Sequence, residues 1–172
     1  MDTLKLIIFD VLTEKITVSK LENWLYNSEE IMNEIDLNSF YFDVISINYK
    51  SCSWKLELNH LAECHLHNDY LEILTIKRSC LNIIESETFE DTHKMLTAAV
   101  RDFEYNTGYS ILWVFSRFKD YFDLVKEGIW KKGTLKNEVK FHSKKTIEII
   151  KNFKNIDELK SQLEENLKPF KD

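Results

Sequence analysis

Apolar residues recur along most of the chain at intervals of three and four, the spacing that places side chains on one face of an α-helix. Three segments repeat most regularly, with these positions on the apolar face: Trp54, Leu58, Leu61, Ala62 and His65; Phe89, His93, Leu96, Val100 and Phe103; Ile111, Phe115, Phe118, Phe122, Val125 and Ile129. A histidine within such a stripe, as at position 93, is typical of a core residue hydrogen-bonded to a neighbour. The pattern predicts a mainly helical protein.

Residues with capping or turn chemistry stand where these helices would begin and end. Thr17 and Ser19 are alternative N-caps for an early helix, and Asn155 is a cap for the final one. Gly108 and Gly128 occupy positions where a helix end favours a left-handed backbone. These signals divide the chain into about seven to eight helices.

Two stretches permit a second interpretation. Residues 70–84 are rich in β-branched side chains, although Ile73, Ile76 and Cys80 also satisfy a helical period. Residues 137–142 could form a short extended piece after Gly133. We therefore expect a single all-α domain over residues 1–172, a helical bundle, with an α+β fold carrying a small sheet near 70–84 and 137–142 as the alternative.

Composition and targeting signals narrow the class of protein. Three glycines and one proline in 172 residues argue against glycine-dependent architectures such as dinucleotide-binding or phosphate-binding loops. The apolar run at residues 6–9 is too short for a signal peptide, and no segment approaches the length needed to span a bilayer. The three cysteines are odd in number and form no C-x-x-C pair. We expect a cytoplasmic protein with reduced thiols and no membrane partner.

Charge is distributed unevenly along the chain. Residues 1–36 carry eight carboxylate side chains and three lysines, a net charge of −5. Residues 126–154 carry nine lysines and three glutamates, a net charge of +6. An acidic surface of this kind is typical of a protein that docks on a basic partner, because charge steers encounter and specificity.

One group of residues has the donor types of a zinc site. On a continuous helix His60, Cys64 and His67 would lie at i, i+4 and i+7, so three nitrogen and sulfur ligands could converge. No second ligand pair is evident, and the competing interpretation is a polar helix end with a half-buried thiol. We predict no metal and no cofactor, and keep a metal-dependent helical enzyme using this cluster as an alternative.

The lysine-rich stretch at 126–154 permits another alternative, a nucleic-acid-binding regulator, because lysines contact phosphates. Trp130 and Phe141 are interleaved with these lysines, but arginine, the residue best suited to bidentate recognition, is scarce: only Arg101 and Arg117 lie between residue 79 and the C-terminus. Lysines on a solvated helix are the ordinary interpretation. A nucleic-acid partner is therefore disfavoured.

Two blocks near the N-terminus resemble a known family. Residues 15–30 (KITVSKLENWLYNSEE) and 40–51 (FYFDVISINYKS) resemble the N-terminal segment of bacterial immunity-like proteins, which are intracellular inhibitors encoded beside secreted or contact-delivered toxins. Residues 102–109 (DFEYNTGY) resemble an aromatic–polar–Gly–Tyr element found downstream in such proteins. The resemblance implies a non-enzymatic protein that neutralises a cognate toxin by occluding its active site or substrate path.

The resemblance and the charge pattern together suggest which residues bind. The expected partner is a cognate toxin with a basic docking surface. The acidic contributors are predicted to be Glu29, Glu30, Glu34 and Asp36. Trp24 and Tyr26 are the leading candidates for aromatic anchors, followed by Tyr41 and Tyr49, since tryptophan and tyrosine dominate interface hot spots. No catalytic residue is predicted, and the chain is not expected to be an enzyme.

Overall fold

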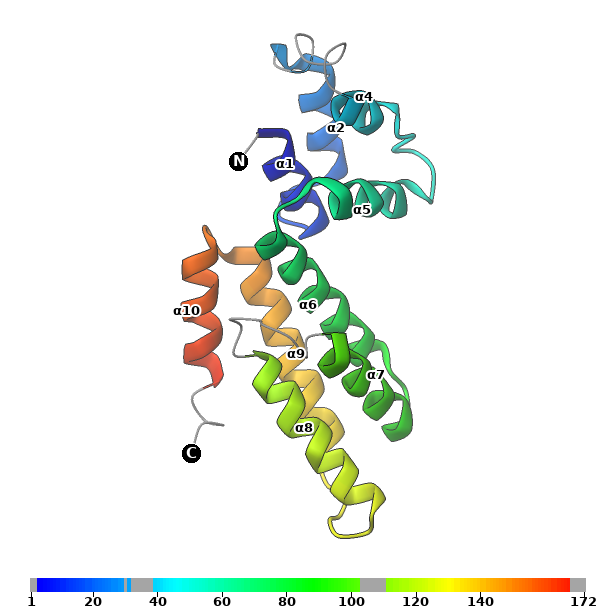
Figure 1. The fold of residues 1–172 in the computed structure, drawn as a ribbon, viewed down its shortest axis with the longest axis vertical. Helices are drawn as coiled ribbons and strands as arrows, with labels where there is room; N and C mark the ends of the chain where they lie inside the picture. Colours follow the sequence, from blue (N-terminus) through cyan, green and yellow to red (C-terminus); the bar gives the residue numbers. More distant parts are fainter. Residues whose placement is uncertain (1–2, 30, 32–38, 103–110, 168–172) are drawn as a thin grey trace. The chain divides into compact units, whose positions relative to one another are not determined.

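The computed structural model describes residues 3–29, 31, 39–102 and 111–167. Throughout this part of the chain the regular structure is helical, without a strand (Figure 1). The helices are α1 (Thr3–Leu12), α2 (Val18–Asn27), α4 (Ser39–Ser46), α5 (Trp54–His65), α6 (Asn68–Glu85), α7 (Phe89–Asp102), α8 (Ile111–Lys126), α9 (Leu135–Asn152) and α10 (Ile156–Leu167). The all-α prediction is confirmed, and the nine helices of the described residues slightly exceed the seven to eight expected.

The alternative with a small sheet is wrong at both places. Residues 70–84 lie within α6, and residues 137–142 lie within α9. In α6 the side chains of Ile73, Ile76 and Cys80 are all buried at helical spacing. Burial of that stripe outweighs the weak preference of β-branched residues for strands.

Contacts within the chain group it into two compact units, residues 1–74 and 75–172. The boundary falls inside α6, so this helix contributes residues to both. The single-domain assignment stays a prediction.

In the N-terminal unit, α1 packs against α2 and α5, and α4 packs against α5. The shared core contains Leu4, Ile8, Leu25 and Leu58, which are fully buried. Of the two alternative caps for α2, Thr17 is the one used: it accepts a hydrogen bond from Lys20 N at 3.4 Å. The first helix, α1, was not expected from the pattern, because its apolar residues run together without a polar face.

In the C-terminal unit, α7 and α8 form a closely packed pair, and α9 and α10 pack on α8 and on each other. Figure 1 shows α8 and α9 running antiparallel, joined by a turn. The helix ends predicted at Gly128 and Asn155 are confirmed. Gly128 has a φ of +76°, and the Asn155 side chain accepts a hydrogen bond from Glu158 N at 2.9 Å. Gly108 lies outside the described residues.

The phenylalanines of α7 and α8 build the centre of this unit. Phe115, Phe118 and Phe122 are buried, and the rings of Phe89 and Phe122 stack at 4.2 Å between centroids. Among the described helices, none is both long enough and apolar enough to cross a membrane.

Candidate protein-binding surface

The net negative charge of the molecule comes from its N-terminal unit. Residues 1–74 carry thirteen carboxylate side chains and five lysines, a net charge of −8, whereas residues 75–172 carry a net charge of +2. Glu29 and Asp43 are exposed. Such an excess within one unit attracts a basic partner over a range set by the ionic strength.

Helix α2 presents the two predicted aromatic anchors on different flanks. Its core side is formed by Leu21 and Leu25, which are fully buried. At about 100° per residue, Trp24 and Tyr26 are separated by about 200° around the axis. Trp24 is half-buried, whereas Tyr26 is 56% exposed. A partner that docks on one flank of α2 therefore contacts Tyr26 or Trp24, and Tyr26 is the accessible one.

The flank of α2 that carries Tyr26 also carries Glu22, one turn earlier. Tyr49 lies close to both side chains. Burial is the main cause that raises the pKa of Tyr49 well above its ordinary value, and the nearby Tyr26 and Glu22 raise it further. The Tyr49 hydroxyl donates a hydrogen bond to Val44 O at 2.8 Å. This flank therefore combines an exposed aromatic ring with a carboxylate one turn away.

Two of the predicted aromatic anchors are core residues. Tyr41 and Tyr49 are both buried, so neither can anchor a partner on the surface of the folded unit. An exposed aromatic was missed instead: Phe42 on α4 is 57% exposed and stands beside exposed Asp43. The helical period could have predicted the exposure of Phe42, because a helix that buries the face of Phe40, Tyr41 and Val44 leaves position 42 on its outer side.

The predicted acidic contributors are only partly described. Glu29 follows the end of α2 and is exposed. Glu30, Glu34 and Asp36 lie outside the described residues. The described side chains that best fit protein binding are therefore Tyr26, Glu22 and Glu29 on and just after α2, and Phe42 and Asp43 on α4.

The structure does not assemble the predicted metal ligands. Helix α5 ends at His65, where the extended backbone of Leu66 caps it and donates a hydrogen bond to Ala62 O at 2.8 Å. His67 consequently leaves the helical register that would align it with His60 and Cys64, and all three side chains are exposed. Within the described ranges no three His, Cys, Asp or Glu side chains are arranged to hold a metal ion.

The polar groups inside the C-terminal unit are engaged in structural contacts. His93 Nε2 lies 2.8 Å from Asp123 Oδ1. Lys119 donates a hydrogen bond to the other carboxylate oxygen at 2.8 Å, and this lowers the pKa of Asp123. His93 also stacks on Phe122, as expected for a core histidine.

Cys80 is a buried thiol with no nucleophilic character. Burial raises its pKa to about 12, although the nearby Ser143 and Thr146 hydroxyl groups act in the opposite direction. A thiol with so high a pKa is almost entirely protonated at neutral pH, and the thiolate is the reactive form. Cys80 therefore fills core space.

Three lysines of the basic stretch make contacts within the unit. Lys140 Nζ donates hydrogen bonds to Ile84 O at 2.8 Å and to Ser86 O, and Lys136 Nζ donates to Glu87 O. These carbonyls lie at and just beyond the C-terminus of α6, where a cation is favoured by the helix dipole. Lys132 pairs with Glu90 at 3.2 Å. These contacts account for a third of the nine lysines that suggested nucleic-acid binding.

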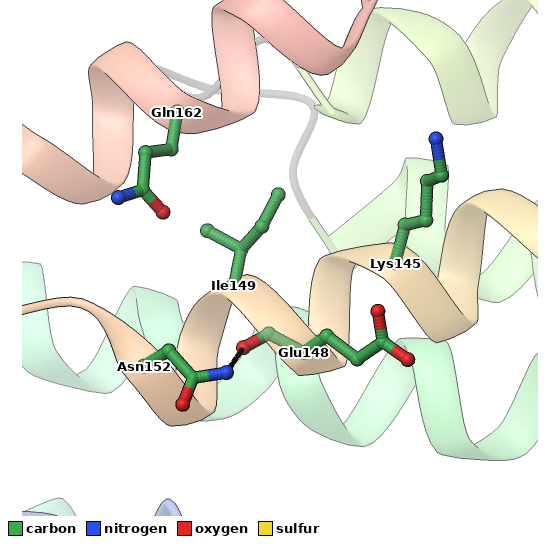
Figure 2. Close-up of a pocket in the computed structure, with 5 residues that line it drawn as sticks. All are labelled: Lys145, Glu148, Ile149, Asn152 and Gln162. Atoms are coloured by element: carbon green, nitrogen blue, oxygen red, sulfur yellow. Dashed lines mark hydrogen bonds between the residues drawn. The ribbon is translucent and has the colours of Figure 1, made fainter.

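A shallow hollow of about 210 Å³ lies between α9 and α10 (Figure 2). Lys145, Glu148, Ile149 and Asn152 come from α9, and Gln162 faces them from α10. Asn152 Nδ2 donates a hydrogen bond to Glu148 O at 2.8 Å, so part of the polar lining is already paired. The hollow is smaller than typical small-molecule pockets of about 300–1,000 Å³.

Comparison with known proteins returned no match to a protein-family model, to a curated protein sequence or to a solved structure. The function is therefore argued from the surface itself.

Proposed function

We propose that this protein is a non-enzymatic immunity protein, which binds a cognate bacterial toxin and neutralises it by occluding its active site or substrate path. The observation that carries the proposal is the exposed Tyr26 beside Glu22 on a unit with a net charge of −8. An accessible tyrosine suits an interface anchor, and the surrounding carboxylates suit a basic partner.

The two rival functions have less support. A metal-dependent enzyme needs converging ligands, and His67 leaves the helix that would align it with His60 and Cys64. A nucleic-acid regulator needs accessible cations, and Lys132, Lys136 and Lys140 are held by intramolecular contacts. The resemblance of residues 15–51 to immunity-like proteins supports the same proposal.

The proposal predicts that a large protein with a toxic C-terminal module is encoded beside this chain's gene, and the decisive experiment uses that module. Co-expression of the chain should restore the growth of cells that produce the module, and the two purified proteins should form a complex in calorimetry. Tyr26→Ala should weaken the complex about tenfold or more, whereas Trp113→Ala should leave it unchanged.

The acidic residues are tested by charge reversal. Changing Glu29, Glu30, Glu34 and Asp36 to lysine should weaken the complex and flatten the dependence of its association rate on salt. A matched variant reverses four exposed carboxylates of the C-terminal unit, namely Asp120, Glu127, Glu148 and Glu165. If both variants bind equally well, or if the chain turns over a substrate that depends on one histidine or cysteine, the proposal is wrong.

A further inference from the structure

The turn between α8 and α9 exposes two adjacent large apolar side chains. Ile129 is 63% exposed and Trp130 is 50% exposed. Lys126 and Lys131 flank them and are also exposed. We call these four residues the α8–α9 tip.

The tip is held in one conformation by the chain itself. Gly128 adopts a left-handed φ of +76° and its N–H donates to Val125 O at 3.1 Å, while the Ile129 N–H donates to Leu124 O at 2.9 Å. This is the hydrogen-bond pattern of a Schellman motif. The Trp130 ring stacks on Tyr121, with centroids 4.9 Å apart. Binding through this indole loses little side-chain entropy, because the ring is already supported.

Charge determines the kind of surface that the tip fits. The tip lies at the start of residues 126–154, whose net charge is +6. A supported tryptophan among lysines fits an acidic protein surface with an apolar recess. Nucleic acid fits less well, because Tyr121 already covers one face of the indole and Ile129 cannot stack on a base. A lipid surface also fits less well, since each lysine near an anionic bilayer contributes only about 1 kcal/mol.

We propose that the α8–α9 tip docks on the acidic N-terminal unit of a second copy of this chain. The N-terminal unit provides the opposite charge, −8, and exposed carboxylates at Glu29 and Asp43. The contact joins two different surfaces, so it is heterologous and leaves one acidic unit and one tip unused in a pair. The proposal shares the acidic unit with the proposed function but needs no toxin.

Sedimentation velocity of the full chain over a range of concentrations tests the contact. The chain should self-associate at about 0.1 M salt and dissociate at about 1 M salt, where the Debye length falls from about 10 Å to about 3 Å. Trp130→Ser and, separately, Lys131→Glu should each raise the dissociation constant, the former about tenfold or more. Trp113→Ser is the matched control, because Trp113 is 81% exposed on α8 and lies outside the tip.

A mixing experiment then identifies the two surfaces. Trp130→Ser keeps the acidic unit, and the double variant Glu29→Lys/Asp43→Lys keeps the tip. Each variant alone should be monomeric, whereas an equimolar mixture should form a one-to-one dimer. A symmetric contact, in which both copies use the same surface, would not be restored by mixing, because one of the two variants lacks that surface.

Four results would overturn the proposal: a monomer at every concentration in low salt, association that is indifferent to Trp130→Ser, association that strengthens with salt, or no dimer in the mixture. Tip-dependent binding of a labelled oligonucleotide or of anionic vesicles by a chain that stays monomeric would overturn it as well. None of these results affects complex formation with a toxin, so failure here and failure of the proposed function are distinguishable.

Discussion

At the scale of single residues, Glu14 is the one non-glycine residue with a positive φ in the part of the chain that the structure describes, and this φ is +65°. It follows α1, where Glu14 N donates to Val11 O and Lys15 N donates to Asp10 O. This is the same helix-ending arrangement that Gly128 makes after α8, but the left-handed residue is a glutamate. A side chain with a Cβ is disfavoured there.

Replacing Glu14 by glycine should therefore raise the free energy of unfolding by about 0.5–1 kcal/mol, because glycine adopts a positive φ without steric penalty. The ion pair of Glu14 with Lys55, at 3.5 Å on the surface, contributes little. Glu14→Ala is the matched control, since it removes the same ion pair and keeps the strained Cβ. Denaturant unfolding of both variants measures the difference, and equal stabilities would contradict this account of Glu14.

His142 makes stability depend on pH near neutrality. Burial is the main cause that lowers its pKa, and Lys145 lowers it further. The unfolded chain, with an ordinary histidine pKa of about 6.5, binds this proton more readily than the folded chain. The contribution of neutral His142 to the free energy of unfolding is therefore fully present above about pH 6.5 and is lost as the pH falls below that value.

His142→Phe should remove this contribution, so its free energy of unfolding should fall less than that of the parent chain between about pH 7 and pH 5. The phenyl ring keeps the contact with Phe118, whose ring centroid lies 5.7 Å from that of His142. The exposed His60→Asn variant serves as the control and should follow the parent chain. Parallel pH profiles for all three proteins would show that His142 does not carry the effect.

At the scale of elements, the turn from α6 to α7 is held by lysines of α9. Lys140 is partly buried, and its ammonium group donates to two carbonyl oxygens, Ile84 O and Ser86 O. The same turn begins α7 with a capping box, in which Asp91 N donates to the Thr88 hydroxyl oxygen at 3.0 Å. In the sequence these lysines suggested a nucleic-acid-binding stretch. In the structure they connect helices within the unit.

Lys140→Met should lower the free energy of unfolding by about 1 kcal/mol, because it keeps the apolar stem and removes the donor from two helix-end carbonyls. Lys144→Met, at an exposed position of the same helix, should change it by less than about 0.5 kcal/mol. Thermal or denaturant unfolding distinguishes the two. Equal losses would mean that the α6 carbonyls do not depend on Lys140.

At the scale of the whole molecule, α6 is one continuous helix across the boundary between the two units. Unfolding of either unit would therefore fray a helix that the other unit also uses. This favours one cooperative transition, in agreement with the single-domain prediction.

Leu25→Ala in the first unit and Phe118→Ala in the second each create a cavity at a fully buried or nearly fully buried site. Each should lower stability by about 2–5 kcal/mol and shift the same single transition, observed by calorimetry and by circular dichroism. Two transitions, each moved by only one of the variants, would show that the units unfold separately.

Apart from α1 and the two stretches at 70–84 and 137–142, the sequence by itself determined which segments are helical and which side of each faces a core. It also determined where α8 and α10 end or begin, and how charge is divided along the chain. These features are local: Gly128, Asn155 and the phenylalanine stripe of α8 act through neighbours within one or two turns. The same local pattern placed His93 correctly on the buried face.

Only the tertiary structure decided which side chains remain available for binding. Lys140 reaches carbonyls more than fifty residues away, and no periodicity encodes that pairing. His67 loses its predicted register because α5 ends two residues earlier. Packing between distant parts of the chain decides which side chains stay available. The spacing of apolar residues at intervals of three and four contains no information about that packing.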